Sequence, residues 1–267
     1  MSGKLCWVLA LSAACGLPAG AGTIVDGNIT TNITWTAAGS PYIIEKAIVE
    51  VRFGSTLTID PGVEVRFQPG RVLETDGGCS IVAVGTAADT IVFTSNAPSP
   101  APEDWGKVQV YNSTGSAFEH CVFSYAKTGL YMIESSPPVS YCSFRSCQRG
   151  LYCQRSSPSI THSSFTGSTW AAIQCYSRES LPSIEDSNLW SNEWNIYLQY
   201  YSGSEPEVTI LAEGNWWGTD DEAGIAASIY DKADDPALNG VVDYDPWLTA
   251  QPVRATSWGV IKALFKG

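Results

Sequence analysis

Apolar residues recur at a nearly fixed spacing through the middle of the chain. Four segments share one layout: FEHCVFSYAKTGLYM, VSYCSFRSCQRGLYC, ITHSSFTGSTWAAIQC and IEDSNLWSNEWNIYL. Their first residues, Phe118, Val139, Ile160 and Ile184, lie 21, 21 and 24 positions apart, and a looser fifth copy begins at Val208. A period of this length indicates a solenoid, because one repeat cannot bury its own apolar face and must stack on its neighbours.

Each repeat contains three short alternating runs separated by Gly, Ser, Pro and Asn, which is typical of strands and not of helical repeats. Three strands and three corners per turn predict an all-β fold, a right-handed parallel β-helix with turns of about 21–26 residues. At the ~4.8 Å strand spacing, about nine or ten turns would form a stack of roughly 45 Å. The positions that we expect to point inward in one strand of each repeat are Leu130, Met132, Leu151, Cys153, Ile173, Cys175, Ile196 and Leu198.

Composition supports one elongated domain, which we expect to be a monomer. The 15 Pro and 24 Gly residues provide corners, the ten Trp and twelve Tyr residues provide bulk, and only 16% of the chain is charged. A net charge of −12 argues against a nucleic-acid partner and mildly against other polyanions, although a local basic strip could overcome it.

The two ends of the chain differ from its body. Lys4 precedes an apolar run, and Ala19-Gly20-Ala21 matches a cleavage site, so residues 1–21 are predicted to be a signal peptide and the protein to be secreted or cell-surface. A lipid anchor at Cys15 is the alternative. No other segment has the ~20 apolar residues that span a membrane. Residues 253–267 form a basic, amphipathic tail, which could be a docking or sorting element or a simple cap.

Removal of the signal peptide would leave six cysteines: Cys79, Cys121, Cys142, Cys147, Cys153 and Cys175. Cys121 and Cys142 occupy equivalent places in adjacent turns, as do Cys153 and Cys175. They are interpreted either as buried free thiols that act as small apolar side chains, or as disulfides between adjacent turns. The spacing of His and Cys does not favour a metal site, and no cofactor is predicted.

Both ends of the predicted stack resemble known sequences. The opening motifs are Thr34-Trp35-Thr36, Ser40-Pro41-Tyr42, Leu57-Thr58-Ile59-Asp60-Pro61-Gly62-Val63, Gly85-Thr86, Ile91-Val92-Phe93-Thr94-Ser95 and Trp105-Gly106. The closing motifs are Asn215-Trp216-Trp217-Gly218 and Pro246-Trp247-Leu248. These resemble secreted bacterial right-handed parallel β-helix repeat proteins of the pectate-lyase-like class. The resemblance implies the fold but not one activity, because that fold carries lyases, hydrolases, epimerases and adhesins.

The closing segment predicts a cap from about residue 213, within a β-helix of residues 22–252. Tryptophans 216, 217 and 247 suit the covering of an exposed sheet end. Helical spacing predicts a short helix over Ala223 to Tyr230, preceded by acidic residues. Calcium binding by Asp231, Asp234, Asp235 and Asp243 is less expected than turn and capping roles, because the spacing does not match an EF-hand loop.

Few features of the sequence point to catalytic residues. Resemblance to pectinolytic lyases would imply a basic residue beside calcium-binding carboxylates, but Arg145, Arg149, Arg155 and Arg178 are scattered and no such motif matches. The third position of each repeat reads His120, Tyr141, His162 and Asp186. Stacking would place these residues on one edge, as an acid/base strip or as a row of polar corner residues.

A second row favours recognition. If the apolar ladder points inward, alternation exposes Tyr131, Tyr152, Gln154, Gln174, Tyr176, Tyr197 and Gln199. Tyrosine rings stack on sugar C–H faces and amides bond hydroxyl groups, although aromatic residues are also common on exposed sheets for packing alone. Two hypotheses therefore remain: non-catalytic binding of a polysaccharide or other cell-surface component through this row, and a polysaccharide lyase or glycoside hydrolase that acts on the outer face.

Overall fold

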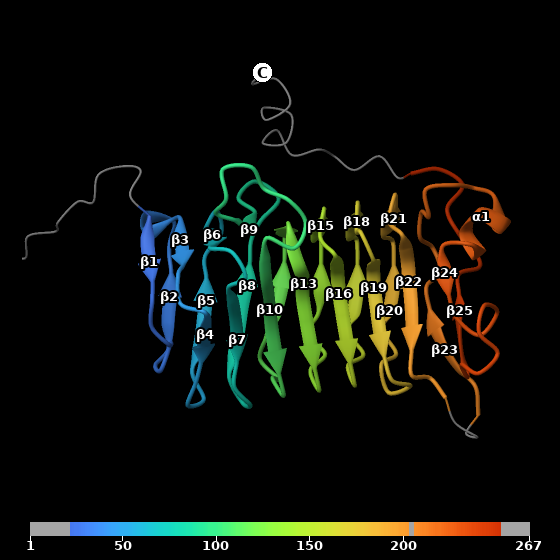
Figure 1. Cartoon of the computed structure of the whole chain (residues 1–267), viewed down its shortest axis with the longest axis horizontal. Helices are drawn as coiled ribbons and strands as arrows, with labels where there is room; N and C mark the ends of the chain where they lie inside the picture. Colours follow the sequence, from blue (N-terminus) through green and yellow to red (C-terminus); the bar gives the residue numbers. More distant parts are fainter. Residues whose placement is uncertain (1–21, 203–205, 252–267) are drawn as a thin grey trace, which may run out of the picture.

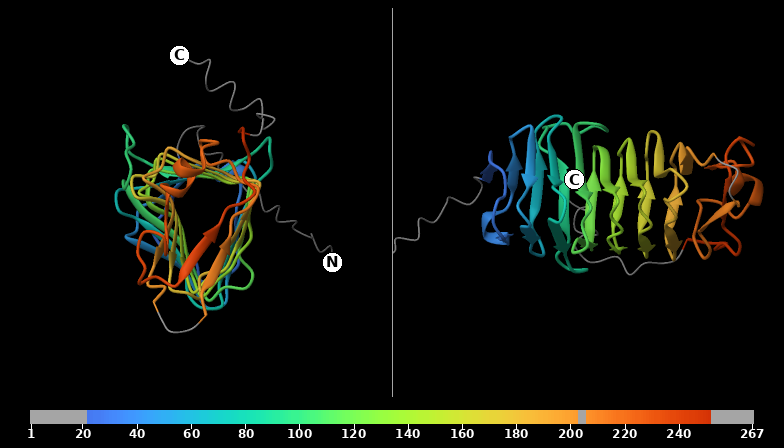
Figure 2. Two further views of the ribbon diagram at one scale, coloured as in Figure 1. Left: turned by 90° about the vertical axis from the view of Figure 1, so that its right-hand side faces the viewer. Right: turned by 90° about the horizontal axis from the view of Figure 1, so that it is seen from below.

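The chain folds into a stack of three-sided coils. The computed structural model describes residues 22–202 and 206–251, and in Figure 1 its strands lie side by side along one long axis. Seen along that axis, the coils enclose a triangle with one sheet on each side (Figure 2). All pairs between neighbouring strands are parallel, so each residue meets its equivalent from the turn before and the turn after. The predicted signal peptide and the tail of residues 253–267 lie outside the described residues.

Three sheets make up the described coils. Sheet A contains β1 (Thr23–Val25), β3 (Tyr42–Ile44), β6 (Glu64–Phe67), β9 (Ile91–Ser95), β12 (Cys121–Ser124), β15 (Ser143–Arg145), β18 (Ser164–Thr166) and β21 (Asn188–Trp190). Sheet B contains β4 (Ile48–Val51), β7 (Val72–Thr75), β10 (Trp105–Tyr111), β13 (Ala126–Ile133), β16 (Arg149–Gln154), β19 (Ala171–Tyr176), β22 (Trp194–Gln199) and β24 (Ile229–Tyr230). Sheet C contains β2 (Ile33–Trp35), β5 (Thr56–Ile59), β8 (Ser80–Val84), β11 (Ala117–Glu119), β14 (Val139–Ser140), β17 (Ser159–Thr161), β20 (Ser183–Glu185), β23 (Val208–Leu211) and β25 (Gly240–Asp243).

Identical side chains stack along the interior. In sheet A, the rings of Phe93, Phe123, Phe144 and Phe165 lie 4.7 to 4.8 Å apart and within 4° of parallel. In sheet B, Leu130 pairs with Leu151, and the same row continues through Ile173 and Ile196. All eight positions predicted to point inward are fully buried. Burial of apolar surface along a continuous column is what joins one turn to the next.

The C-terminal end is closed by a compact segment. Trp217 is buried, Trp247 packs against the core, and a helical turn, α1 (Glu222–Ala226), buries Ile225. The Asp221 carboxylate caps α1 by accepting a hydrogen bond from the Gly224 N–H at 3.0 Å. A 3-10 turn, η1 (Ala37–Gly39), lies near the other end.

The predicted helix over Ala223 to Tyr230 is wrong in its second half. The helix ends at Ala226, and Ile229 begins strand β24, which pairs with Ile196 of β22. Pairing with the sheet and extension of the buried Leu/Ile row decide the conformation of Ile229, so tertiary contacts override the local helical spacing.

Candidate functional site

The outer face of sheet B carries the residues that the sequence singled out for recognition. Tyr131 pairs with Tyr152 across β13 and β16, and the same row continues to Gln174 and Tyr197. The next outward row places Tyr176 between Gln154 and Gln199. These strands lie side by side at the front of Figure 1. The regular pairing therefore brings residues from four successive turns onto one surface.

Four tyrosines on this face form an unbroken series of ring contacts, which we call the tyrosine strip. The ring centroids of Tyr131 and Tyr152 are 4.6 Å apart, those of Tyr152 and Tyr176 5.9 Å, and those of Tyr176 and Tyr200 4.8 Å. Tyr200, just after β22, is 60% exposed and was missed by the sequence analysis because it lies at a corner with a positive φ of 59°. Burial raises the pKa of Tyr131 and of Tyr152, so both hydroxyls are neutral donors at physiological pH.

Tyr197 belongs to a separate aromatic cluster. Its ring lies 5.2 Å from Trp170, 6.1 Å from Trp194 and 4.6 Å from Tyr230. Trp170 and Trp194 precede the regular alternation of β19 and β22, and Tyr230 comes from the cap, so the repeat pattern did not include them. Burial raises the pKa of Tyr197. The outward row thus ends in an aromatic patch at the capped end of sheet B.

The glutamines of this face form hydrogen bonds within the protein. Gln174 is only 3% exposed, so the prediction that alternation exposes its side chain is wrong. Its amide joins neighbouring strands, since Oε1 accepts from Arg149 Nε at 2.5 Å and Nε2 donates to Gln199 Oε1 at 2.7 Å. Gln154 Oε1 accepts from the Tyr131 hydroxyl at 2.5 Å. These hydrogen bonds link β13, β16, β19 and β22 across the face.

Basic side chains surround a hollow at one end of the tyrosine strip. The hollow has a volume of about 400 Å³ and is lined by Lys107, Lys127 and Arg149 together with Tyr131 and Tyr152. Lys107 lies over the Tyr131 ring, 4.7 Å from its centroid. Burial lowers the pKa of Lys107, and the negative charge of Glu74 partly offsets that effect. We call this site the basic hollow. Of its three basic residues, only Arg149 was considered from the sequence, as one of four scattered arginines.

The candidate acid/base row lies at a different corner of the coil, between sheets C and A. His120 and Tyr141 stack at 4.8 Å, and so do Tyr141 and His162. His162 Nε2 is 3.7 Å from Asp186 Oδ2, with both side chains well exposed. All four residues have φ near 50°, the left-handed conformation that turns the chain from one sheet to the next. The predicted stack forms, but on a surface separate from the tyrosine strip.

The six cysteines of the described chain are buried free thiols. Cys153 and Cys175 occupy paired positions in β16 and β19, and the hydrogen bond with the Cys175 thiol, together with burial, raises the pKa of Cys153. Burial raises the pKa of Cys147 to about 12. Cys147 and Cys153 are therefore protonated at neutral pH. All six cysteines fill the core as small apolar groups.

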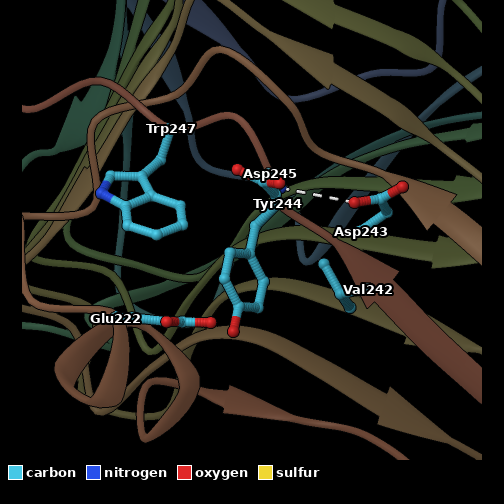
Figure 3. A pocket seen from close by; sticks show the side chains of 6 residues that line it. All are labelled: Glu222, Val242, Asp243, Tyr244, Asp245 and Trp247. Atoms are coloured by element: carbon cyan, nitrogen blue, oxygen red, sulfur yellow. Dashed lines mark hydrogen bonds between the residues drawn. The ribbon is translucent and has the colours of Figure 1, made fainter.

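A second hollow, of about 410 Å³, lies in the cap (Figure 3). Tyr244 stands at its centre, with the Glu222 carboxylate near its hydroxyl and Trp247 beside its ring. Asp243 Oδ1 accepts a hydrogen bond from the Asp245 N–H at 3.3 Å. In the same segment, Asp231 accepts from the N–H groups of Ala233 and Val242, a turn-stabilising role. No group of three or more His, Cys, Asp or Glu side chains in the described ranges could hold a metal ion.

Comparison with known families agrees with this architecture. Residues 75–228 match the family described as right handed beta helix region, and residues 27–117 match the pectate-lyase like beta helix domain. The chain belongs to the right-handed β-helix family, which confirms the predicted handedness and fold class. No curated protein and no solved structure matches the chain. Within the described residues, no helix has the length and apolar character needed to cross a membrane.

Proposed function

We propose that this protein binds carbohydrate, or another glycan-bearing component of a cell surface, on the outer face of sheet B without cleaving it. The tyrosine strip carries this proposal. Four partly exposed rings in continuous contact provide a long, stiff surface with both apolar faces and hydroxyl donors. Such a surface suits sugar rings, which present C–H faces for stacking and hydroxyls for hydrogen bonds.

Rigidity supports a binding role. Tyr131, Tyr152 and Tyr176 sit on strands paired with neighbours on both sides, and side-chain hydrogen bonds such as that from Gln174 to Gln199 tie the outer face together. Side chains fixed before binding lose little conformational freedom when a ligand arrives. The candidate acid/base row is on another corner, which argues against a shared catalytic site.

Glycan-array binding of the full chain would test the proposal. The variant Tyr131→Ala/Tyr152→Ala/Tyr176→Ala should lose binding by roughly a hundredfold or more, because buried aromatic anchors each contribute about 1–2 kcal/mol or more. Phe53→Ala is the matched control, since Phe53 is a 75% exposed aromatic residue on the turn after β4. Retained circular dichroism and melting temperature would show that both variants are folded.

Two outcomes would overturn the proposal. Unchanged glycan binding by the triple variant would place the site elsewhere. Release of shortened or unsaturated products from a polysaccharide would favour the enzyme hypothesis, and abolition of cleavage by His162→Ala would assign it to the histidine row.

The proposal includes export, because residues 1–21 have the pattern of a signal peptide. N-terminal sequencing of the protein recovered from outside the producing cell should begin at or near Gly22. Two results would contradict export by this route: an extracellular protein that still carries Met1, or no protein at all outside the producing cell.

A further inference from the structure

Basic side chains are few in this acidic protein, and most have an acceptor within the chain. Carboxylates pair with Arg52, Arg66, Arg155 and Lys232. Backbone or amide oxygens bind Lys46, Arg71 and Arg178. Within the described ranges, seven basic side chains form no ion pair, and three of these, Lys107, Lys127 and Arg149, line the basic hollow together. Their gathering is unlike the rest of the surface.

The sheet fixes two of these cations in line. Lys107 of β10 pairs with Thr128 of β13, which pairs with Arg149 of β16, so two strand spacings, about 10 Å, separate the Lys107 and Arg149 backbones. Lys127 precedes Thr128 and approaches the same hollow. The three charges therefore converge from adjacent turns of the coil.

Neutral amide oxygens hold two of the three cations, Lys107 and Arg149, in place without cancelling their charge. Arg149 donates from Nε to Gln174 Oε1 at 2.5 Å and from Nη1 to Gln148 Oε1 at 2.6 Å. Lys107 donates to Gln109 Oε1 at 2.5 Å. Glu74 is the acidic group that interacts with Lys107, but it is not among the residues that line the hollow. The hollow thus has a preorganised positive lining without a carboxylate.

We propose that the basic hollow binds the acidic group, a carboxylate or a sulfate, of a glycan whose sugar rings lie on the tyrosine strip. This inference rests on the proposed function and narrows the ligand to an acidic glycan. Planar guanidinium and ammonium donors suit both anions, and Tyr131 and Tyr152 border the hollow, so one sugar could contact cation and ring together. Local attraction at this site opposes the repulsion that a protein of net charge −12 exerts on an acidic ligand.

Three polymers with one backbone would test the inference on the full chain: dextran, carboxymethyl dextran and dextran sulfate. The parent protein should bind at least one charged polymer well above dextran, and the stronger of the two identifies carboxylate or sulfate as the preferred group. Lys107→Gln/Lys127→Gln/Arg149→Gln should weaken that binding by roughly a thousandfold, since three charge-assisted contacts are lost and each contributes about tenfold.

A charge-matched control separates a built site from general attraction. Arg66→Gln/Arg145→Gln/Lys232→Gln also removes three positive charges, but from sheet A and the cap. This control should bind the charged polymer within about threefold of the parent in the same salt, because distant exposed charges are screened. Melting temperatures would confirm that both variants are folded.

Equal weakening by the two triple variants would overturn the inference, and so would failure of the parent to bind either charged polymer. Binding of dextran as tight as that of the charged polymers would also overturn it. The proposed function would survive each of these results if glycan-array binding still depended on the tyrosine strip. If the parent protein bound no glycan on the array, the proposed function itself would be refuted.

Discussion

The stacked phenylalanines of sheet A predict that the same substitution costs different amounts at two adjacent turns. Phe144 lies between two parallel rings, those of Phe123 and Phe165, each with its centroid 4.8 Å away. Phe165 has one ring partner, because its other neighbour in the ladder is Leu189. Both side chains are fully buried, so exposure cannot distinguish the two sites.

Replacement by leucine should therefore destabilise the protein more at residue 144 than at residue 165. The change of shape costs up to about 1.5 kcal/mol at either site. Each lost aromatic pair adds about 0.5–1.5 kcal/mol. Two pairs are lost in Phe144→Leu and one in Phe165→Leu, so the free energies of unfolding should differ by about 0.5–1.5 kcal/mol.

Urea denaturation followed by far-ultraviolet circular dichroism would measure this difference, with Phe165→Leu as the matched control. Equal slopes of the free energy of unfolding against urea concentration would show that the two variants expose the same amount of surface when they unfold. Equal destabilisation, or greater destabilisation by Phe165→Leu, would refute the ring-stacking account and leave cavity formation as the dominant cost.

Three further results are expected. Gly150→Ala should lower the free energy of unfolding by about 1–3 kcal/mol, because the new Cβ would lie 2.6 Å from the Ala172 carbonyl oxygen. The control Gly27→Ala, whose Cβ would meet nothing within 4 Å, should change it by less than about 0.5 kcal/mol, and equal effects of the two variants would contradict the packing argument. Iodoacetamide at pH 8 should leave Cys147 unlabelled in the native protein by peptide mass spectrometry, since its pKa is about 12, and labelling without denaturant would show an open core. Binding of the charged dextran should weaken as the pH rises through the lowered pKa of Lys107, because only the protonated amine attracts the anion. The variant Lys107→Arg should keep binding to higher pH, and a flat pH profile of the parent would show that Lys107 does not bind the anion.

The fold could be predicted because one simple rule repeats along the chain. Inward residues such as Leu130, Leu151, Ile173 and Ile196 recur in every turn, so their burial follows from alternation alone. The same reasoning placed Tyr131 and Tyr152 outside. It failed at Gln174, which is buried, because alternation gives the direction of a side chain but not how much of it neighbouring residues cover.

The basic hollow could not be predicted because it depends on a register shift. Between β10 and β13 the pairing moves from Lys107 with Thr128 to Val108 with Leu130, which leaves Gly129 as an extra residue. Counting along an ideal strand therefore misplaces Lys107 relative to Lys127 and Arg149. Glycine is needed at residue 129, since a Cβ there would lie 2.8 Å from the Gly150 carbonyl oxygen.

The parallel register has a consequence for the size of the molecule. Val139 pairs with Phe118 on one side and with Ile160 on the other, and each is 21 residues from the next. Removal of residues 139–159 would let Phe118 pair with Ile160 and Phe123 with Phe165. Each row of stacked, equivalent residues would then be continuous again. The protein can thus change length only in steps of one turn, about 4.8 Å. Such a step would remove Tyr152 and Arg149 together. The length of the outer face that is available to a ligand would therefore change only in whole turns.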